Sequence, residues 1–242
     1  MNRWEVNGAM KESRDQERLR SLIREHRMEN VFPEELEPHL LLCDYEQGES
    51  ICKQGETAEY LYVLVGGKIK VFTTSPEGRA LILSFKTPLE VIGDIEYIQG
   101  NPFINTVQAV MPATMVAVHH RWLNKYGQSH PQLLQFLLQI VTRKFYIKSN
   151  FMSFNLMHPV EVRLASYLLS VSQGDSGAFA TDPPDVFQLS DIANLLGTSY
   201  RHLNRVIHKF CKDGLIERRR GIILIKNREK LFEVAGGNIY EE

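Results

Sequence analysis

Basic and amide side chains recur at helical spacing in a short stretch near the C-terminus. Arg201, Asn204 and Arg205 share one side of a predicted helix with Tyr200 and His208. A guanidinium can donate two hydrogen bonds to guanine and a carboxamide can pair with adenine, each with about 1–3 kcal/mol of discrimination. We therefore expect Arg201 and Arg205 to contact guanine, and Asn204 to contact adenine, in the major groove of DNA.

Two short helices around a glycine position these side chains. Ser190 and Asp191 can cap the first helix, and Gly197 ends it because glycine accepts a positive φ. Thr198 or Ser199 can cap the second helix, and both are expected to contact phosphate near the helix start. The spacing predicts a helix-turn-helix, whereas the alternative is an ordinary pair of surface helices with a solvated charged face. The apolar residues that would bury the pair are Ile192, Leu195, Leu196, Leu203, Val206, Ile207 and Phe210.

A short hairpin follows the second helix. Residues 215–216 and 222–225 are predicted to be strands, and the tip between them holds Arg218, Arg219 and Arg220. A hairpin beside a helix-turn-helix forms a wing that can touch phosphates. We expect these three arginines to add affinity that is independent of sequence and falls with salt.

Basic charge is concentrated in this region. Residues 197–230 hold ten Lys or Arg against three Asp or Glu, whereas residues 158–196 hold one against five. The whole chain is nearly neutral, with 28 Lys and Arg against 29 Asp and Glu. A local basic surface on a neutral chain favours docking to double-stranded DNA.

Length and composition indicate a globular chain of one large or two ordinary domains, at 242 residues. No apolar run approaches the length of a transmembrane helix, and the N-terminus lacks the apolar core of a secretory signal. We therefore expect a cytoplasmic protein with no membrane partner. The three cysteines are widely spaced, which argues against a disulfide framework.

Short β segments separated by turns occupy the middle of the chain. Many short strands at regular spacing predict a sandwich or roll of antiparallel sheet, and the absence of a βαβ rhythm excludes a doubly wound sheet. The predicted strands are 40–45, 60–65, 68–73, 80–85 and 114–118, with turns at Gly48-Glu49, Gly55-Glu56, Gly66-Gly67 and 75–78.

A long helix from His130-Pro131 to about Phe154 carries two apolar stripes. One stripe can pack on the β domain, and the second needs another cover, most simply the same helix of a second subunit. The alternative is a helix buried within its own chain. The stripes are Leu133, Leu137, Ile140, Ile147 and Phe151 on one side, and Leu134, Leu138, Val141 and Phe145 on the other.

These patterns predict an α+β protein of four parts. In the first part, Lys11–Arg27 reads as a helix that is either a partner surface or packed on the following domain. The four parts are a charged N-terminal arm at 1–34, a β-roll at 35–129, a dimerisation helix at 130–156 and a winged helix-turn-helix domain at 157–242. Within the last part we predict a hinge at 157–159, a helix at Val160–Val171, a loop at 173–184, a strand at Val186–Leu189 and a helix around Arg228–Val234.

Several segments carry a family resemblance: Gly48-Glu49, Tyr62–Gly67, Ile92-Gly93-Asp94 and Leu189–Phe210, with Ser199–Leu203 and Gly214–Ile216. Together with the order of the elements, they resemble the CRP/FNR family of bacterial transcription regulators, closest to its YeiL-like subgroup, over roughly residues 35–230. The resemblance implies a cupin-like β-roll of the cyclic-nucleotide-binding type and a homodimer that reads a palindromic DNA site. In that family an Arg-Glu pair and a later Arg face the bases. Here those positions hold Tyr200, Arg201 and Arg205, so we expect a different half-site.

The effector pocket departs from the family pattern. In cyclic-nucleotide members a Gly-Glu pair precedes a segment whose arginine holds the phosphate. Here Gly93-Asp94 keeps the first half and the later segment reads Ile104-Asn105-Thr106, with no arginine between Arg79 and Arg121. A buried phosphate without a cationic partner is costly, so we expect neither cAMP nor cGMP, and these residues remain the candidate pocket for an unidentified effector.

Metal and redox sites have weak support in the sequence. An iron–sulfur cluster normally takes four thiolates, and this chain has Cys43, Cys52 and Cys211. Cys43 and Cys52 are either a thiol switch or, more commonly for such residues, two small buried hydrophobes. His119 and His120 are adjacent on a strand and point to opposite sides, which favours structural roles over haem or metal ligation. We predict no bound metal.

We therefore expect a homodimeric, sequence-specific transcription regulator, with RNA polymerase as a possible partner and a β-roll that acts through a hinge near His158. The alternative is a β-roll regulatory subunit that controls an enzyme through protein docking. The protein itself is not expected to be an enzyme, because the sequence has no P-loop, nucleophile elbow, His-Glu metal motif or Gly-rich dinucleotide turn.

Overall fold

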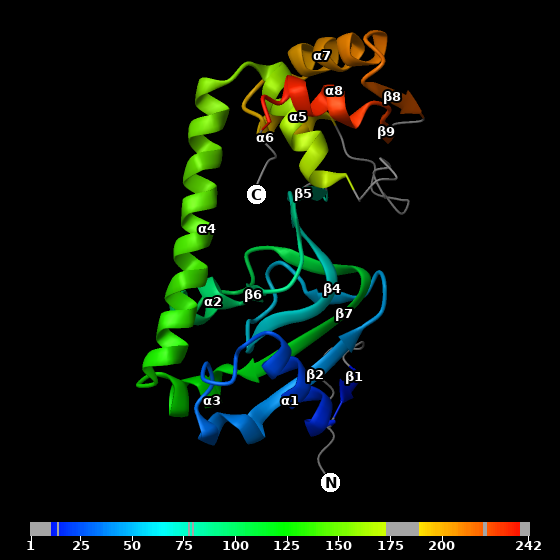
Figure 1. Cartoon of the computed structure of the whole chain (residues 1–242). Coiled ribbons are helices and arrows are strands. Elements are labelled where there is room, and N and C mark those ends of the chain that lie inside the picture. The colour runs from blue at the N-terminus through cyan, green and yellow to red at the C-terminus, as the bar shows by residue number, and fades with distance from the viewer. Residues whose placement is uncertain are drawn as a thin grey trace. The chain divides into compact units, whose positions relative to one another are not determined.

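The computed structural model describes residues 11–13, 15–76, 78, 80–172, 189–219 and 222–237. The chain divides into two compact units (Figure 1). Unit 1 comprises residues 1–73 and 85–144, and unit 2 comprises residues 74–84 and 145–242.

Unit 1 is built on an antiparallel roll, as the sequence predicted. The strand order is β1-β2-β7-β4-β5, with β3 paired to β7 and β6 paired to β4. Its long ladder joins β4 to β7, from Tyr60 opposite His119 to Phe72 opposite Thr106. The strands are β1 (Lys11–Ser13), β2 (Leu40–Tyr45), β3 (Ser50–Cys52), β4 (Tyr60–Thr74), β5 (Ala80–Lys86), β6 (Glu90–Ile92) and β7 (Thr106–His119).

The predicted turn at Gly66-Gly67 was wrong. Residues 60–74 form one strand, β4, whose register against β7 shifts around Gly66 and Lys68. Gly67 has φ +83° and lies against the backbone of Pro112. A Cβ at this position would lie 2.1 Å from the Pro112 carbonyl oxygen. A glycine pair that looks like a turn in sequence is therefore a bulge inside a continuous strand. The predicted strand at 114–118 is likewise the end of the longer β7.

The N-terminal segment differs from the predicted helix. Lys11–Ser13 forms β1, which pairs with β2, and helix α1 spans Gln16–Glu25 after an N-cap at Asp15. Leu19 and Ile23 of α1 are buried. Of the two alternatives, the helix packs on the β domain, because its apolar side completes the core of unit 1.

The sheet buries a core on each side. Because successive residues of a strand point to opposite faces, Leu61 and Val63 of β4 join one cluster, while Tyr62 and Leu64 join the other. The first cluster includes α1 and the start of α4 (Pro131–Met157). The second fills the inside of the roll and includes Phe103.

Helix α4 extends three residues beyond its predicted end, to Met157. Leu133 and Leu137 of the first stripe are buried in unit 1. The second stripe is exposed in the single chain, with Leu138 66% and Phe145 72% exposed. None of the helices that the structure describes is long and apolar enough to cross a membrane. The shorter helical segments of unit 1 are η1 (Glu34–His39), α2 (Asp94–Gln99), α3 (His120–Trp122) and η2 (Leu123–Gly127).

Unit 2 contains the predicted winged helix-turn-helix, with small shifts of its boundaries. Helix α6 begins at Leu189, so Leu189 is helical instead of ending a strand, and Ser190 and Asp191 lie in the first turn instead of capping it. The predicted loop at 173–184 and residues 186–188 lie outside the described residues. The elements are α5 (Val160–Val171), α6 (Leu189–Leu195), α7 (Tyr200–Lys212), β8 (Ile216–Arg219), β9 (Ile222–Ile225) and α8 (Arg228–Val234).

The bulge at Gly67 makes a stability prediction. Gly67→Ala should lower the free energy of unfolding by more than about 4 kcal/mol, because a Cβ there meets backbone atoms that cannot rotate away. Gly48 is a matched control, since its φ is +87° and a Cβ would meet nothing within 4 Å. Gly48→Ala should cost about 1–2 kcal/mol. Equal losses for the two variants in thermal or denaturant unfolding would contradict the close-approach explanation.

Candidate nucleic-acid interface

The turn between α6 and α7 is closed by backbone hydrogen bonds. Gly197 has φ +59°, and the N–H groups of Gly197 and Thr198 donate to the carbonyls of Asn194 and Ala193, at 3.1 and 2.8 Å. Arg163 of α5 donates from Nη1 to the Leu196 carbonyl. These bonds satisfy carbonyls that the end of α6 leaves without helical partners, so the angle between the two helices is well determined.

Ser199 begins α7 as its N-cap, as one of the two sequence alternatives predicted. Its hydroxyl oxygen accepts from the His202 N–H at 3.2 Å, and its φ and ψ are extended. Capping uses an oxygen lone pair and leaves the hydroxyl hydrogen available as a donor. Thr198 is half-buried beside it.

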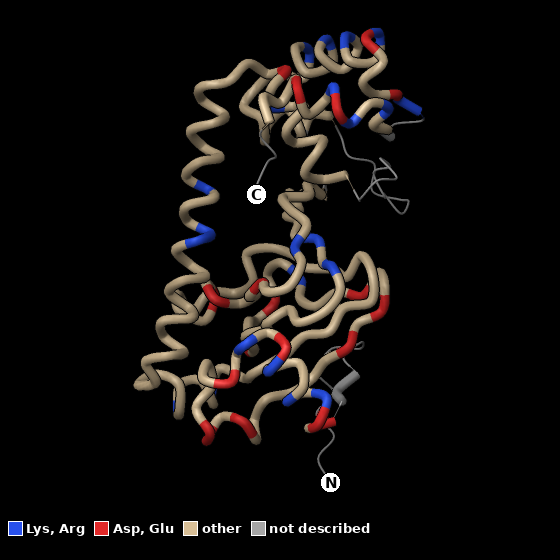
Figure 2. The backbone as a smooth tube through the Cα atoms, in the orientation of Figure 1, with Lys and Arg blue, Asp and Glu red and all other residues tan. Residues whose placement is uncertain are grey.

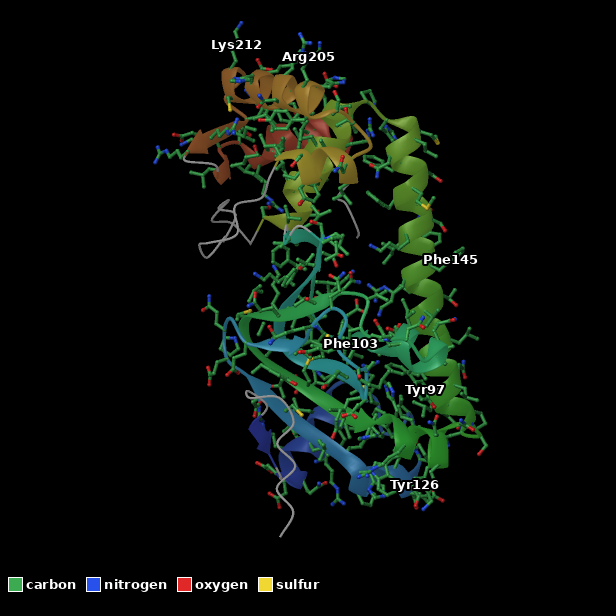
Figure 3. The ribbon with its side chains drawn as sticks, turned by 180° about the vertical axis from the view of Figure 1, so that it is seen from behind. Tyr97, Phe103, Tyr126, Phe145, Arg205 and Lys212 are labelled. Carbon is green, nitrogen blue, oxygen red and sulfur yellow. The ribbon has the colours of Figure 1, made fainter. Side chains whose placement is uncertain are left out.

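The sides of α7 differ sharply in character. Leu203, Val206, Ile207 and Phe210 are all at most 2% exposed. Positions three, four and seven residues apart share a helix face, so burying these four directs the residues between them outward. The exposed residues are Tyr200, Arg201, Arg205, His208, Lys209 and Lys212. Figure 3 shows Arg205 and Lys212 projecting from α7 away from the helices that it packs on.

Lys212 was missed among the candidate site residues. It is exposed and continues the row of Arg201, Arg205 and His208 along the helix. The sequence signal was its spacing of seven residues from Arg205, which repeats the face. Lys209, by contrast, lies 4.0 Å from Glu161 of α5.

The two wing arginines that the structure describes, Arg218 and Arg219, have different partners. Arg218 Nη1 donates to Asn204 Oδ1 at 3.2 Å. Arg219 pairs with Glu217, and its guanidinium holds the pKa of that carboxyl below its ordinary value. Arg218 and Arg219 lie within β8 instead of at a loop tip, and Arg220 lies outside the described residues. Figure 2 shows Lys and Arg gathered on α7 and β8.

The predicted effector residues meet different partners. Gly93 adopts φ +88° before α2, where a Cβ would lie 2.7 Å from the Tyr60 carbonyl oxygen. The Ile104 N–H donates to Glu96 at 3.0 Å, and Thr106 Oγ1 accepts from the Gln54 N–H at 3.0 Å. Asn105 offers its carbonyl to the Cys52 thiol at 3.9 Å. The segment at 104–106 is thus bonded to neighbouring loops.

Asp94 is held by a lysine from α4. The Asp94 side chain is 4% exposed, and Lys144 Nζ lies 2.9 and 3.0 Å from its two carboxylate oxygens. The same ammonium donates to the Val91 carbonyl at 2.6 Å and pairs with Glu90 at 3.2 Å. Three donors of one ammonium therefore bind the corner between β6 and α2 to α4, which lies alongside α2 (Figure 1). We call this contact the Lys144 clamp.

Residues 93–106, all of which the structure describes, include no arginine. Phe103, 6% exposed, packs inside the roll in a cluster with Tyr45 and Tyr62. A hollow of about 280 Å³ lies outside this cluster, and its lining includes Thr57 and Tyr97 but not the predicted effector residues. Its volume is at the lower limit of pockets that hold small ligands. Figure 3 labels Tyr97 and Phe103.

The cysteines and the paired histidines lie at buried or half-buried positions. Cys43 and Cys52 are buried, free thiols, and burial raises the pKa of Cys52 to about 12. They lie opposite Met115 and Val107, which are eight residues apart on β7. Cys211 is half-buried on α7.

His119 caps α3, where its Nδ1 accepts from the Arg121 N–H at 3.1 Å, and the His120 ring lies 5.0 Å from that of Tyr97. Burial lowers the pKa of both histidines. In the part of the chain that the structure describes, no group of His, Cys, Asp and Glu is arranged to hold a metal ion.

Two family models match the chain, the first within the β-roll and the second within the helix-turn-helix domain. Residues 42–130 match the family described as cyclic nucleotide-binding domain, and residues 162–234 match the Crp-like helix-turn-helix domain. The chain is 24% identical over 191 residues to the CRP-like cAMP-activated global transcriptional regulator of Mycobacterium tuberculosis, which covers 78% of this chain and 85% of that protein. It is 27% identical over 197 residues to regulatory protein YeiL of Escherichia coli O157:H7, and the match covers 81% of this chain and 84% of YeiL.

A solved structure shows the same fold. The putative transcriptional regulator of the CRP/FNR family from Eubacterium rectale superposes with a TM-score of 0.66 at 16% identity, covering 84% of this chain and 92% of that one. These findings confirm the predicted fold class and the resemblance. The matched relatives are regulators and not enzymes. With a cyclic-nucleotide-binding-type roll followed by a Crp-like helix-turn-helix DNA-binding domain, the protein belongs to the CRP/FNR family of transcription regulators.

Proposed function

We propose that the protein acts in the cytoplasm as a homodimer that binds a palindromic DNA site through α7. The observation that carries this proposal is the exposed row of Arg201, Arg205, His208 and Lys212, which lies opposite the buried face of α7. A helix with cations along one exposed side fits the major groove, where arginine reads guanine. Ser199 and Thr198 at the helix start, and Arg219 on the wing, are the phosphate contacts.

The exposed stripe of α4 supports a dimer. Leu134, Leu138, Val141 and Phe145 are 38–72% exposed in the single chain, and such a row on a helix of 27 residues is a seam that a second copy can cover. A dimer places two recognition helices in successive major grooves, about 34 Å apart. We propose RNA polymerase as a further partner on DNA.

The Lys144 clamp supports DNA binding that needs no cyclic nucleotide. The Asp94 carboxylate, at the position of the family's nucleotide-binding acid, already has a cation, and Phe103 packs inside the roll with Tyr45 and Tyr62. A nucleotide would have to break the clamp and bury a phosphate that lacks a cationic partner. We infer that this contact is one route from the roll to α4, beside the packing of Leu133 and Leu137 in unit 1.

Protein docking by the basic domain is the second candidate function. It is favoured by the exposed aromatic ring of Tyr200, 51% exposed, at the start of α7. A row of three cations and a histidine at helical spacing, with a capped helix start, is a better match to the major groove.

The proposal is tested by selecting bound sequences from a random duplex pool with purified protein and no added effector. A two-fold symmetric motif with half-sites about one helical turn apart is expected. The selection is repeated with cAMP, which should change neither motif nor affinity. Failure to enrich a motif both without effector and with cell extract would refute sequence-specific binding.

Arg205 and Arg219 should separate the two kinds of DNA contact. Arg205→Ala should weaken binding to the selected site by about 1–3 kcal/mol and binding to random DNA little. Arg219→Ala should weaken both and reduce the slope of log affinity against log salt by about 1. The measurement is a fluorescence anisotropy titration at several salt concentrations. Equal losses of affinity for the selected site and for random DNA in Arg205→Ala would contradict a base contact of Arg205.

Phe145 tests the dimer seam. Phe145→Glu should weaken the dimer by more than about 2 kcal/mol, because it places a carboxylate in each copy of an apolar contact. Light scattering after gel filtration should then give the mass of a single chain at a concentration where the wild type gives twice that mass. Met111→Glu is the control, since Met111 is 48% exposed and belongs to β7, not to α4. A Phe145→Glu protein that stays dimeric would contradict the seam.

The Lys144 clamp makes a stability prediction. Lys144→Met should cost about 3 kcal/mol, and so lower the melting temperature by roughly 6–12 °C, because it leaves Asp94 buried without its cation. Asp94→Asn in the same chain should restore much of this loss, since the neutral amide needs no cation. If the losses of unfolding free energy in Lys144→Met and Asp94→Asn simply add in the double variant, the two residues are not coupled.

A further inference from the structure

One side-chain hydrogen bond joins the wing to the recognition helix. Arg218 of β8 donates from Nη1 to Asn204 Oδ1 of α7 at 3.2 Å, across 14 residues of sequence. The backbone holds the two elements in place around it, because the Leu215 N–H donates to the Phe210 carbonyl and the Lys226 N–H to the Leu215 carbonyl, both at 2.9 Å. Ile216 and Ile223 bury the inner side of the wing.

This bond fixes which end of the Asn204 amide faces the wing. Arginine carries N–H donors and no acceptor, so the carbonyl oxygen of Asn204 must face Arg218 and the amide nitrogen must lie at the other end of the planar group. The guanidinium charge also polarises the amide and strengthens its N–H groups as donors.

Asn204 stands beside the exposed row of α7. It is half-buried, three residues after Arg201 and four before His208, both of which are exposed. Residues at these spacings are neighbours on a helix surface, so Asn204 lies at the edge of the surface that faces the DNA.

Adenine recognition by asparagine uses both ends of the amide. The oxygen accepts from adenine N6 while the nitrogen donates to N7. The oxygen keeps a second lone pair, but with that end of the amide turned toward Arg218, the nitrogen end is the one presented to a base. Guanine O6 and N7 and thymine O4 accept in the major groove. Adenine places its N7 acceptor beside the N6 amino donor, which opposes a second donor, and cytosine presents only the N4 amino donor.

We propose that Arg218 restricts Asn204 to its donor end, so that Asn204 selects a base with a keto oxygen, guanine or thymine, and rejects cytosine. This assignment rests on the proposed DNA binding and replaces the adenine contact expected from the sequence. Arg218 acts as a positioning residue for Asn204, and its remaining N–H groups face phosphate as the other wing cations do.

The test is the random-pool selection, run with the full-length wild type and three variants. In the wild type, one position of each half-site should favour guanine or thymine over cytosine by roughly 5–150-fold. Arg218→Met frees the Asn204 oxygen, and the preference at that position should move to adenine. Arg219→Met removes the same charge from the wing without touching Asn204, and its motif should match that of the wild type.

Asn204→Asp is the independent second variant. It keeps an oxygen for Arg218 and replaces the donor with an acceptor, so cytosine should become the favoured base at the same position. An unchanged base preference in both Arg218→Met and Asn204→Asp would overturn the assignment, even though the motif itself is found. No motif from the wild type would refute the proposed function and this inference together. Circular dichroism of each variant confirms that its fold is retained.

Discussion

Burial of four apolar side chains on α7 is the constraint that the DNA-facing surface depends on. Leu203, Val206, Ile207 and Phe210 each lose nearly all contact with water, and a helix of 3.6 residues per turn then has one possible outward side. Arg205 and its cationic neighbours point outward for this reason and not because of any contact that they make. The Gly197 turn and the Ser199 cap determine where this helix begins.

The Lys144 clamp joins the roll to the long helix from within the chain. The Lys144 ammonium of α4 contacts Asp94, Glu90 and the Val91 carbonyl. The clamp also explains how the buried carboxylate of Asp94 is tolerated.

Apolar and aromatic side chains pack together elsewhere in the roll. Phe103 lies in the cluster with Tyr45 and Tyr62. The buried Cys43 and Cys52 lie on β2 and β3, opposite residues of β7 that are eight positions apart. A thiol whose pKa is raised by burial is a poor nucleophile and a poor metal ligand, as for Cys52.

The sequence by itself determined the elements whose signals are local. The apolar period of 160–171, the Gly197 turn and the Ser199 cap depend on residues a few positions apart, and the structure has them where the spacing indicated. Arg218 and Arg219, by contrast, lie within β8 instead of at the predicted tip. Gly66-Gly67 was misread because a bulge and a turn use the same glycines, and the difference lies in Pro112 on another strand. The tertiary structure alone decided the partners of side chains distant in sequence. Lys144 lies 50 residues from Asp94, and Arg218 lies 14 residues from Asn204, so no spacing rule could pair them.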